Sequence, residues 1–279
     1  MILKYFIRSS SSRLLVKFLL VLLTLFFVFP LVWMLLTSIK TRVDFLAMPP
    51  KWLFRPTLEN YLNVTRTEDF VHAYLNSIII SVGSVSAGVL IGVPVAYGLS
   101  RFKFKGRSQL SFWILSTRFA PPVVVLIPFF IAYSALKLTD TRIGMILIYL
   151  VLNLPLIIWV MYGFINEVPI DIEEAALVDG ASPLKIFWRI VVPLVAPGLV
   201  ATSILALIFT WNEMLFAIIL TSFKARTIPV AIFNFISFME IAWGNLCAAG
   251  MLAILPVMIF TLLIQKRIVS GLTFGAIKS

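Results

Sequence analysis

The sequence is poor in charged residues: Asp, Glu, Lys and Arg make up only 13% of its 279 positions. A soluble domain typically contains about 25% charged and about 45–50% apolar residues, whereas this chain is 61% apolar. It has one cysteine, Cys247, and one histidine, His72, so it cannot form an internal disulfide and has no Cys/His cluster for a metal. One histidine and few acids also leave no nucleophile with its base, so the sequence indicates neither an enzyme nor a cofactor site.

A phosphate-binding loop of the form G-x-x-x-x-G-K-[ST] is also missing. The nearest approach, Gly271 to Ser279, has the wrong spacing and follows no predicted strand. The chain therefore cannot hydrolyse ATP by the usual P-loop route. If it takes part in an ATP-driven process, another subunit must supply the ATPase.

Long apolar runs are abundant instead. A bilayer core about 30 Å thick requires roughly 20 apolar residues in a helix, and six such windows predict an all-α membrane protein with six transmembrane helices. A seventh apolar stretch, 228–241, is too short to span and contains Asn234 and Glu240, so we expect it to be interfacial or re-entrant. The six predicted spans are 14–37, 72–99, 110–136, 143–165, 193–220 and 247–265.

Small residues and prolines predict how these spans pack. Ser84, Gly88, Gly92 and Ala96 recur every four residues in the second span, and such a stripe lets two helices approach closely. We favour a contact within the chain over a subunit interface. Prolines inside the spans each remove a helix hydrogen bond, so the bundle should be irregular; they are Pro121, Pro122, Pro128, Pro155, Pro197 and Pro256.

The net charge of +11 is unevenly distributed, which argues for a membrane and lipid contacts and against nucleic acid. Arg101, Lys103, Lys105 and Arg107 fill the short loop after the second span without any acid between them. By the positive-inside rule this loop is cytoplasmic. The expected protein is a multi-pass protein of the cytoplasmic (inner) membrane with the N-terminus (1–13), the loop 166–193 and the tail (266–279) in the cytoplasm, and the loops 38–71 and 221–246 outside.

The loop 166–193 contains signals for two short helices. Asp171 is predicted as the N-cap of the first helix, with Glu174 three residues later at the capping-box spacing. Gly180 is predicted to end that helix in a left-handed conformation. Ser182 and Pro183 then form a second helix start. Pro193 is predicted to close the second helix, where the fifth span begins.

These residues resemble a known motif. Glu174-Ala175-Ala176, Gly180 and Ile190-x-Val192-Pro193 have the spacing of the EAA loop of ATP-binding-cassette (ABC) importer permeases, in which the last part reads Ile-x-Leu-Pro. Trp211-Asn212-Glu213 resembles the maltose-type, carbohydrate-uptake branch, as do the segments 56–61, 226–230 and 271–273.

This resemblance implies a type I ABC importer permease-like bundle that moves a carbohydrate by alternating access. It also implies a second homologous permease subunit, two cytoplasmic ATP-binding subunits and an extracytoplasmic solute-binding protein. The loop would couple the permease to the ATPases through Glu173, Glu174, Ala175, Ala176, Asp179, Gly180 and Pro193.

Polar residues inside the spans are the candidates for the solute path, because each needs a partner or water in the bilayer. Arg118 lies in the third span, Asn153 in the fourth, and Trp211, Asn212 and Glu213 towards the outer end of the fifth. Amide, carboxylate and indole groups suit the hydroxyls and apolar faces of a sugar. The alternative is that Asn212 and Glu213 only join helices and that Arg118 reaches for the membrane surface.

Two other functions stay open at this point. One is a permease of the same superfamily for a non-sugar solute, such as a polyol, glycerol phosphate or an amino acid. The other is an ion-coupled carrier that works alone. That carrier requires carboxylates near the middle of spans, whereas Glu213 is the only acid in a predicted span and lies near its end.

Overall fold

The computed structural model describes the backbone of residues 10–236 and 241–274, and the side chains of 14–233, 235–236 and 241–262. Within these ranges the chain is helical without strands, and one isolated β-bridge joins Ile236 to Ile241. The predicted all-α class is confirmed. Residues 1–9 of the predicted cytoplasmic N-terminus and Glu240 of the stretch 228–241 lie outside the described residues.

The chain forms two compact units, each assembled from separate stretches of sequence. The first contains Met1–Thr67 and Asn234–Leu252, and the second contains Glu68–Phe233 and Ala253–Ser279. The first unit includes α2 (Ser10–Ser38), α3 (Arg42–Phe45), α4 (Glu59–Arg66) and the beginning of α15 (Trp243–Phe274).

Polar side chains join α2 to α4 in the first unit. The Asn60 amide donates to the carbonyls of Ser38 and Lys40, both at 2.9 Å, and the hydroxyls of Ser38 and Tyr61 are 2.8 Å apart. The Lys40 ammonium is buried and lies 5.1 Å from the centre of the Trp33 ring, a cation–π distance. The loop after the first span is therefore an ordered structure.

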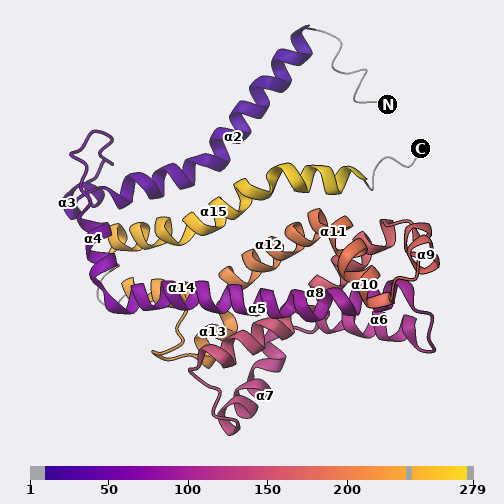
Figure 1. Cartoon of the computed structure of the whole chain (residues 1–279). Coiled ribbons are helices and arrows are strands. Elements are labelled where there is room, and N and C mark those ends of the chain that lie inside the picture. The colour runs from indigo at the N-terminus through magenta and orange to yellow at the C-terminus, as the bar shows by residue number, and fades with distance from the viewer. Residues whose placement is uncertain (1–9, 237–240, 275–279) are drawn as a thin grey trace. The chain divides into compact units, whose positions relative to one another are not determined.

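The second unit contains most of the helices (Figure 1). They are α5 (Glu68–Arg101), α6 (Arg107–Ser116), the 3-10 turn η1 (Thr117–Phe119), α7 (Pro122–Ala135), α8 (Arg142–Glu167), α9 (Ile170–Val178), α10 (Pro183–Ile186), the π-helical turn η2 (Phe187–Val191), α11 (Val192–Leu194), α12 (Ala196–Asn212), α13 (Leu215–Leu220) and α14 (Ile228–Ile232). A further 3-10 turn, η3 (Phe233–Phe235), follows α14.

The small-residue stripe of α5 packs against α8, as the sequence predicted. Ser84, Gly88, Gly92 and Ala96 are all buried. A Cβ atom added at Gly88 or Gly92 would lie 2.7 or 2.8 Å from the side chain of Ile157 in α8. The absence of side chains at these two positions is what allows the two helices to approach so closely.

The six predicted spans correspond to four continuous helices and two bent pairs. The continuous helices long and apolar enough to cross a membrane are Leu14–Ser38, Glu68–Arg101, Arg142–Glu167 and Trp243–Leu262. The total reaches six when each bent pair, Arg107–Phe119 with Pro122–Ala135 and Pro183–Leu194 with Ala196–Asn212, is counted as one span.

The third predicted span is not one continuous helix: its halves meet at 94°. Ala120 and Pro121 are extended, with ψ of 125° and 122°. Both precede a proline, which disfavours the helical conformation of the residue before it. The next helix can then begin at Pro122, because its first position needs no N–H donor.

The fifth predicted span, 193–220, also differs from the structure. Pro193 does not close a helix, because α11 continues to Leu194 and the chain turns by 75° after it. Pro197 cannot donate to the Pro193 carbonyl, so the helical ladder is interrupted at this point. A second break follows α12, and the Glu213 carboxylate caps α13 by accepting the Phe216 N–H at 3.1 Å.

The short apolar stretch 228–241 begins with α14, which is too short to span a membrane. Ile228 and Ala231 are buried, and α14 packs against α5. The Ile228 N–H donates to the Ser77 hydroxyl of α5 at 2.8 Å. This part of the stretch is therefore a packed element of the second unit.

The α5–α8 contact generates a stability prediction. Gly92→Ala places a methyl group 2.8 Å from the buried Ile157, so we expect a loss of about 1–3 kcal/mol, the usual range for overpacking. Gly163→Ala in α8 is the matched control, since its Cβ meets nothing within 4 Å. The control should be neutral or gain up to about 1 kcal/mol from helix propensity. Thermal unfolding in detergent measures both, and equal midpoints would contradict the packing argument.

Candidate functional site

A cavity of about 660 Å³ lies among η1, α7, α8, α12 and α13, a volume typical of small-molecule sites. We call it the Glu213 cavity. Three of the five predicted path residues line it: Arg118, Asn153 and Glu213. Hydroxyl groups and aromatic rings complete the wall, from Thr117, Thr210, Tyr149, Phe129, Phe209 and Phe216.

Arg118 reaches this cavity because the third span breaks beside it. The residue lies in η1, and its guanidinium donates to the Leu152 carbonyl at 3.4 Å. The same group lies 5.0 Å from the centre of the Phe209 ring. Arg118 is exposed, so further N–H donors face open space.

Asn153 both lines the cavity and joins two helices. Its side-chain amide donates to the Thr210 hydroxyl at 2.6 Å, and both residues are buried. Thr210 in turn donates to the Ala206 carbonyl of its own helix, α12. Asn153 therefore lines the proposed path and at the same time forms a polar link between α8 and α12.

Glu213 presents one carboxylate oxygen without a protein partner. Oε1 accepts the Phe216 N–H, whereas Oε2 is buried and has no hydrogen bond among the described residues. A buried acceptor without a partner is costly. The wall of the Glu213 cavity therefore contains an acceptor without a partner among the described residues, although this oxygen itself exposes almost no surface.

Trp211 and Asn212 do not line this cavity. Trp211 is buried on another side of α12, where its indole N–H donates to the Ala253 carbonyl of α15 at 3.0 Å. The Asn212 amide donates to the Ile208 carbonyl of its own helix. Helical periodicity places Thr210 on the same face as Glu213, three residues apart, and turns the two intervening residues away.

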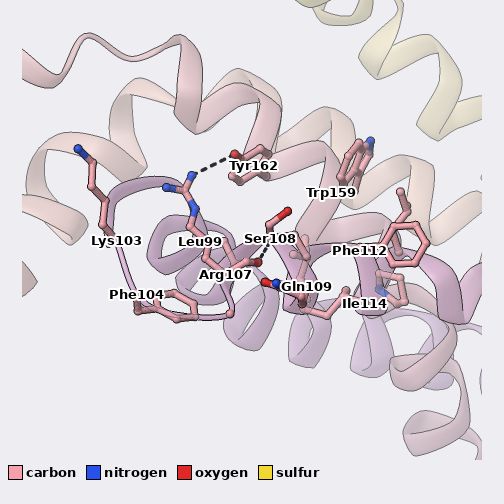
Figure 2. A pocket seen from close by; sticks show the side chains of 15 residues that line it. Leu99, Lys103, Phe104, Arg107, Ser108, Gln109, Phe112, Ile114, Trp159 and Tyr162 are labelled. Carbon is pink, nitrogen blue, oxygen red and sulfur yellow. Dashed lines mark hydrogen bonds between the residues drawn. The ribbon is translucent and has the colours of Figure 1, made fainter.

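A second cavity, of about 760 Å³, lies between the end of α5, α6 and α8. Figure 2 shows Lys103 at one end, Trp159 and Phe112 at the other, and the Arg107 guanidinium donating to the Tyr162 hydroxyl at 3.1 Å. We call it the Arg107 cavity. The sequence analysis used its basic residues only to orient the chain, and their proximity to aromatic side chains of α8 was not predicted.

Pro155 of α8 lines both cavities. The third predicted span also lines both, with different parts on the two sides of its break at 117–121. Among the residues of the third predicted span, those that line the Arg107 cavity lie in α6, and those that line the Glu213 cavity lie in η1, in α7 and at Ala120. The two cavities therefore lie one after the other along the same pair of helices.

The loop 166–193 forms the predicted pair of helices, with one correction. Helix α9 begins at Ile170 after Pro169 in the N-cap position, and no side chain caps it. Asp171 is therefore not the N-cap, and Glu174 does not complete a capping box. The extended Pro169, with ψ of 130°, already forms the helix entry, so Asp171 lies in the first turn and contributes negative charge there.

The end of α9 agrees with the prediction. Gly180 has φ of +81°. The Ala181 N–H donates to the Ala176 carbonyl and the Gly180 N–H to the Leu177 carbonyl, both at 3.0 Å, the two bonds of a Schellman motif. Ser182 and Pro183 then begin α10, although the Ser182 hydroxyl makes no cap hydrogen bond.

The loop has an inner and an outer face. Glu173, Ile186 and Phe187 are buried, Ala176 is partly buried, and the apolar ones pack against the core beneath. Glu174, Ala175, Asp179 and Pro193 are exposed. The adjacent glutamates Glu173 and Glu174 therefore point in different directions.

Apolar residues that the sequence analysis did not select occupy the outer face. Val178 is 88% exposed and Leu184 is 69% exposed, on either side of Gly180, with Ile172 and Leu177 also exposed. Exposed apolar groups rimmed by acids are typical of protein–protein contact sites. Sequence could not identify them, because an apolar residue in a helix is expected to be buried.

Asp140 anchors the segment that follows α13. Its carboxylate accepts the backbone N–H groups of residues 222–225 at 2.9–3.2 Å. Burial would raise the pKa of this carboxyl, but the four donors outweigh burial and lower the pKa below its ordinary value. The buried Asn76 amide also donates to the carbonyls of Lys224 and Arg226. The segment is thus held at both ends.

Comparison with known proteins identifies the chain's relatives. Residues 88–273 match the family described as the binding-protein-dependent transport system inner membrane component. The trehalose transport system permease protein SugB of Mycobacterium tuberculosis is 38% identical over 89% of this chain and 92% of its own length. The trehalose/maltose transport system permease protein MalG of Thermococcus litoralis is 36% identical over 92% of this chain and 94% of its own length.

The fold comparison agrees. A chain of a bacterial ABC transporter involved in the import of the acidic polysaccharide alginate matches with a TM-score of 0.79 and 25% identity, over 92% of this chain and 98% of that one. The family match excludes an ion-coupled carrier that works alone. Members of this family are permease subunits of ABC importers, in which the ATPase is a separate subunit. The chain belongs to the family of inner-membrane components of binding-protein-dependent transport systems, as a multi-pass permease subunit of an ABC importer.

Proposed function

We propose that this permease imports a carbohydrate and that the solute passes through the Glu213 cavity. The wall of the cavity combines the Glu213 carboxylate, whose buried Oε2 has no partner among the described residues, with the Arg118 guanidinium, the Asn153 amide and aromatic rings. Hydrogen-bonding groups beside apolar faces are what a sugar requires, since it presents hydroxyls at its edge and C–H groups on its faces. The unpartnered Glu213 Oε2 is the main observation behind this proposal, and the sugars named for SugB and MalG support it.

The outer face of the loop 166–193 is the proposed contact for an ATPase subunit. Glu174 and Asp179 offer charge, Ala175 allows a close approach, and Val178 with Leu184 offers apolar area. Gly180 fixes the angle between α9 and α10. We propose two such ATPases, a second permease subunit related to this one, and a solute-binding protein that contacts the segments 38–71 and 221–246.

We also propose that both termini and the loop 166–193 are cytoplasmic. The basic loop 101–107 supports this orientation through the positive-inside rule. The loop 166–193 packs on the end of α5 that leads into this basic loop, so the two share one side of the membrane (Figure 1).

Cysteine labelling tests the orientation. In a Cys247→Ser background, a cysteine at Leu53, which is 95% exposed, should react with a membrane-impermeant thiol reagent added outside intact cells. A cysteine at Ile170, which is exposed at the start of α9 and outside the proposed ATPase contact, should react only after the cells are opened. Labelling of position 170 from outside would reverse the proposed orientation.

The solute path is tested with a pair of neighbouring residues. Glu213→Gln keeps the oxygen that caps α13 but removes the negative charge, so we expect the half-saturating concentration for uptake to rise about 10- to 100-fold, the value of a charged hydrogen bond. Asn212→Leu is the control, since Asn212 does not line the cavity. Uptake of labelled trehalose and maltose, followed by polyols and amino acids, measures the effect and identifies the solute. Unchanged uptake in Glu213→Gln, or transport of only the non-sugar solutes, would count against the proposal.

The contact with the ATPases is tested on the outer face of the loop. Glu174→Lys reverses an exposed charge, and Gly180→Val forces a β-branched residue to φ of +81°. Both variants should insert into the membrane but lose their co-purifying ATPase subunits. Gly106→Val is the matched control, because Gly106 has φ of +90° in a different loop. ATPase retention equal to wild type in both loop variants would remove this surface from the coupling mechanism.

A further inference from the structure

Arg101, the last residue of α5, makes four hydrogen bonds through one guanidinium group. Nε donates to Glu173 Oε1 at 2.6 Å, and Nη1 donates to the Ser100 hydroxyl at 3.2 Å. Nη2 donates to the carbonyls of Ile165 and Val168, both at 2.8 Å. The two carbonyls belong to the last turn of α8 and the residue after it, where carbonyls have no i+4 partner within the helix.

Glu173 accepts a second hydrogen bond from α5. The Tyr97 hydroxyl donates to Glu173 Oε2 at 2.8 Å, so both carboxylate oxygens are occupied. Tyr97 and Arg101 are one helical turn apart and face the same side of α5. The side chains of Arg101 and Glu173 are only 11% and 7% exposed.

This arrangement joins three elements: α5, the C-terminal end of α8, and α9. A lysine could not reproduce it, because only the planar guanidinium can donate in several fixed directions at once. The other contact of Tyr97 with this loop is apolar and less directional: the centres of the Tyr97 and Phe187 rings are 5.0 Å apart. A buried ion pair is weak evidence for overall stability, but loss of one partner leaves the other charge buried and unpaired.

We propose that Arg101 is a positioning residue for the transport cycle, acting through Glu173 so that α9 moves with α5 and α8 as one body. The inference rests on the proposed function of the loop 166–193. An ATPase that pulls on the outer face of α9 would otherwise displace α9 along the membrane domain without moving the helices that line the cavities. The two adjacent glutamates then differ in role: Glu174 meets the ATPase, and Glu173 transmits the displacement.

Distances between spin labels test this directly and require no knowledge of the solute. One label replaces Ile91 on the exposed side of α5 and the other replaces Ile170, an exposed residue of α9 outside the proposed ATPase contact, in a Cys247→Ser background. The assembled complex is measured without nucleotide and with ATP in the absence of Mg²⁺. In the chain with Arg101 and Glu173 intact, the distance should be the same in both states.

Variants of the Arg101–Glu173 ion pair should allow α9 to move independently of α5 and α8. In Glu173→Gln and Arg101→Gln the distance distribution should broaden, and its mean should change when ATP binds. Arg101→Met combined with Glu173→Leu removes both charges together, so it gives the same test if a single variant does not fold. Arg107→Gln is the matched control, since Arg107 bonds to Ser100 and Tyr162 but not to α9.

Functional measurements accompany the distances. The ion-pair variants should retain their ATPase subunits, as Glu174→Lys should not, yet hydrolyse ATP with at least a fivefold lower uptake of solute per ATP. An unaltered chain whose label distance already changes with ATP would overturn the inference. So would variants that match the unaltered chain in distance and in uptake per ATP. Failure of the unaltered chain to retain ATPases would instead overturn the proposed function on which the inference rests.

Discussion

The close approach of α5 and α8 is the constraint on which the rest of the second unit depends. Lipid provides no hydrophobic force between helices, so their association relies on packing and on polar contacts. Gly88 and Gly92 bring α5 against Ile157, and the ends of the same pair hold the polar contacts. At one end Arg101 donates to α9 and to the end of α8, whereas at the other Asn76 accepts from Arg142 and donates to the carbonyls of Lys224 and Arg226. A single helix pair thus positions segments on opposite sides of the protein.

Irregular backbone at membrane depth is tolerated only where protein or water satisfies its polar groups. Two of the three breaks described above lie beside polar side chains. Arg118 donates to a carbonyl of α8 beside the break at 117–121, and Glu213 caps α13 at the break after α12. Both residues also line the Glu213 cavity. The polar groups beside these two breaks are therefore the same ones that face the proposed solute path.

Much of this architecture could be predicted from sequence, because the signals were periodic or local. The apolar windows, the small-residue stripe and the left-handed Gly180 each depend on residues close together in the chain. The predictions that were wrong concerned features that depend on the exact start and rotation of a helix or on residues far apart in the chain. Pro169 started α9 before Asp171, and the helical phase of α12 turned Trp211 and Asn212 away from the cavity while Thr210 faced it. Spacing of three from Glu213 would have identified Thr210. The burial of Glu173 depends on Arg101, 72 residues away, and no local pattern encodes that distance.

Pro155 has a consequence for how α8 can deform. A proline inside a helix removes one hydrogen bond, here the one that the Val151 carbonyl would otherwise accept. This missing bond lies where α8 lines both cavities. Above and below it, α8 is anchored by Asn153 to α12 and by its C-terminal carbonyls to Arg101. Helix α8 therefore has one internal hydrogen bond fewer at the level where it lines both cavities, so a bend at Pro155 would change the shape of both cavities together.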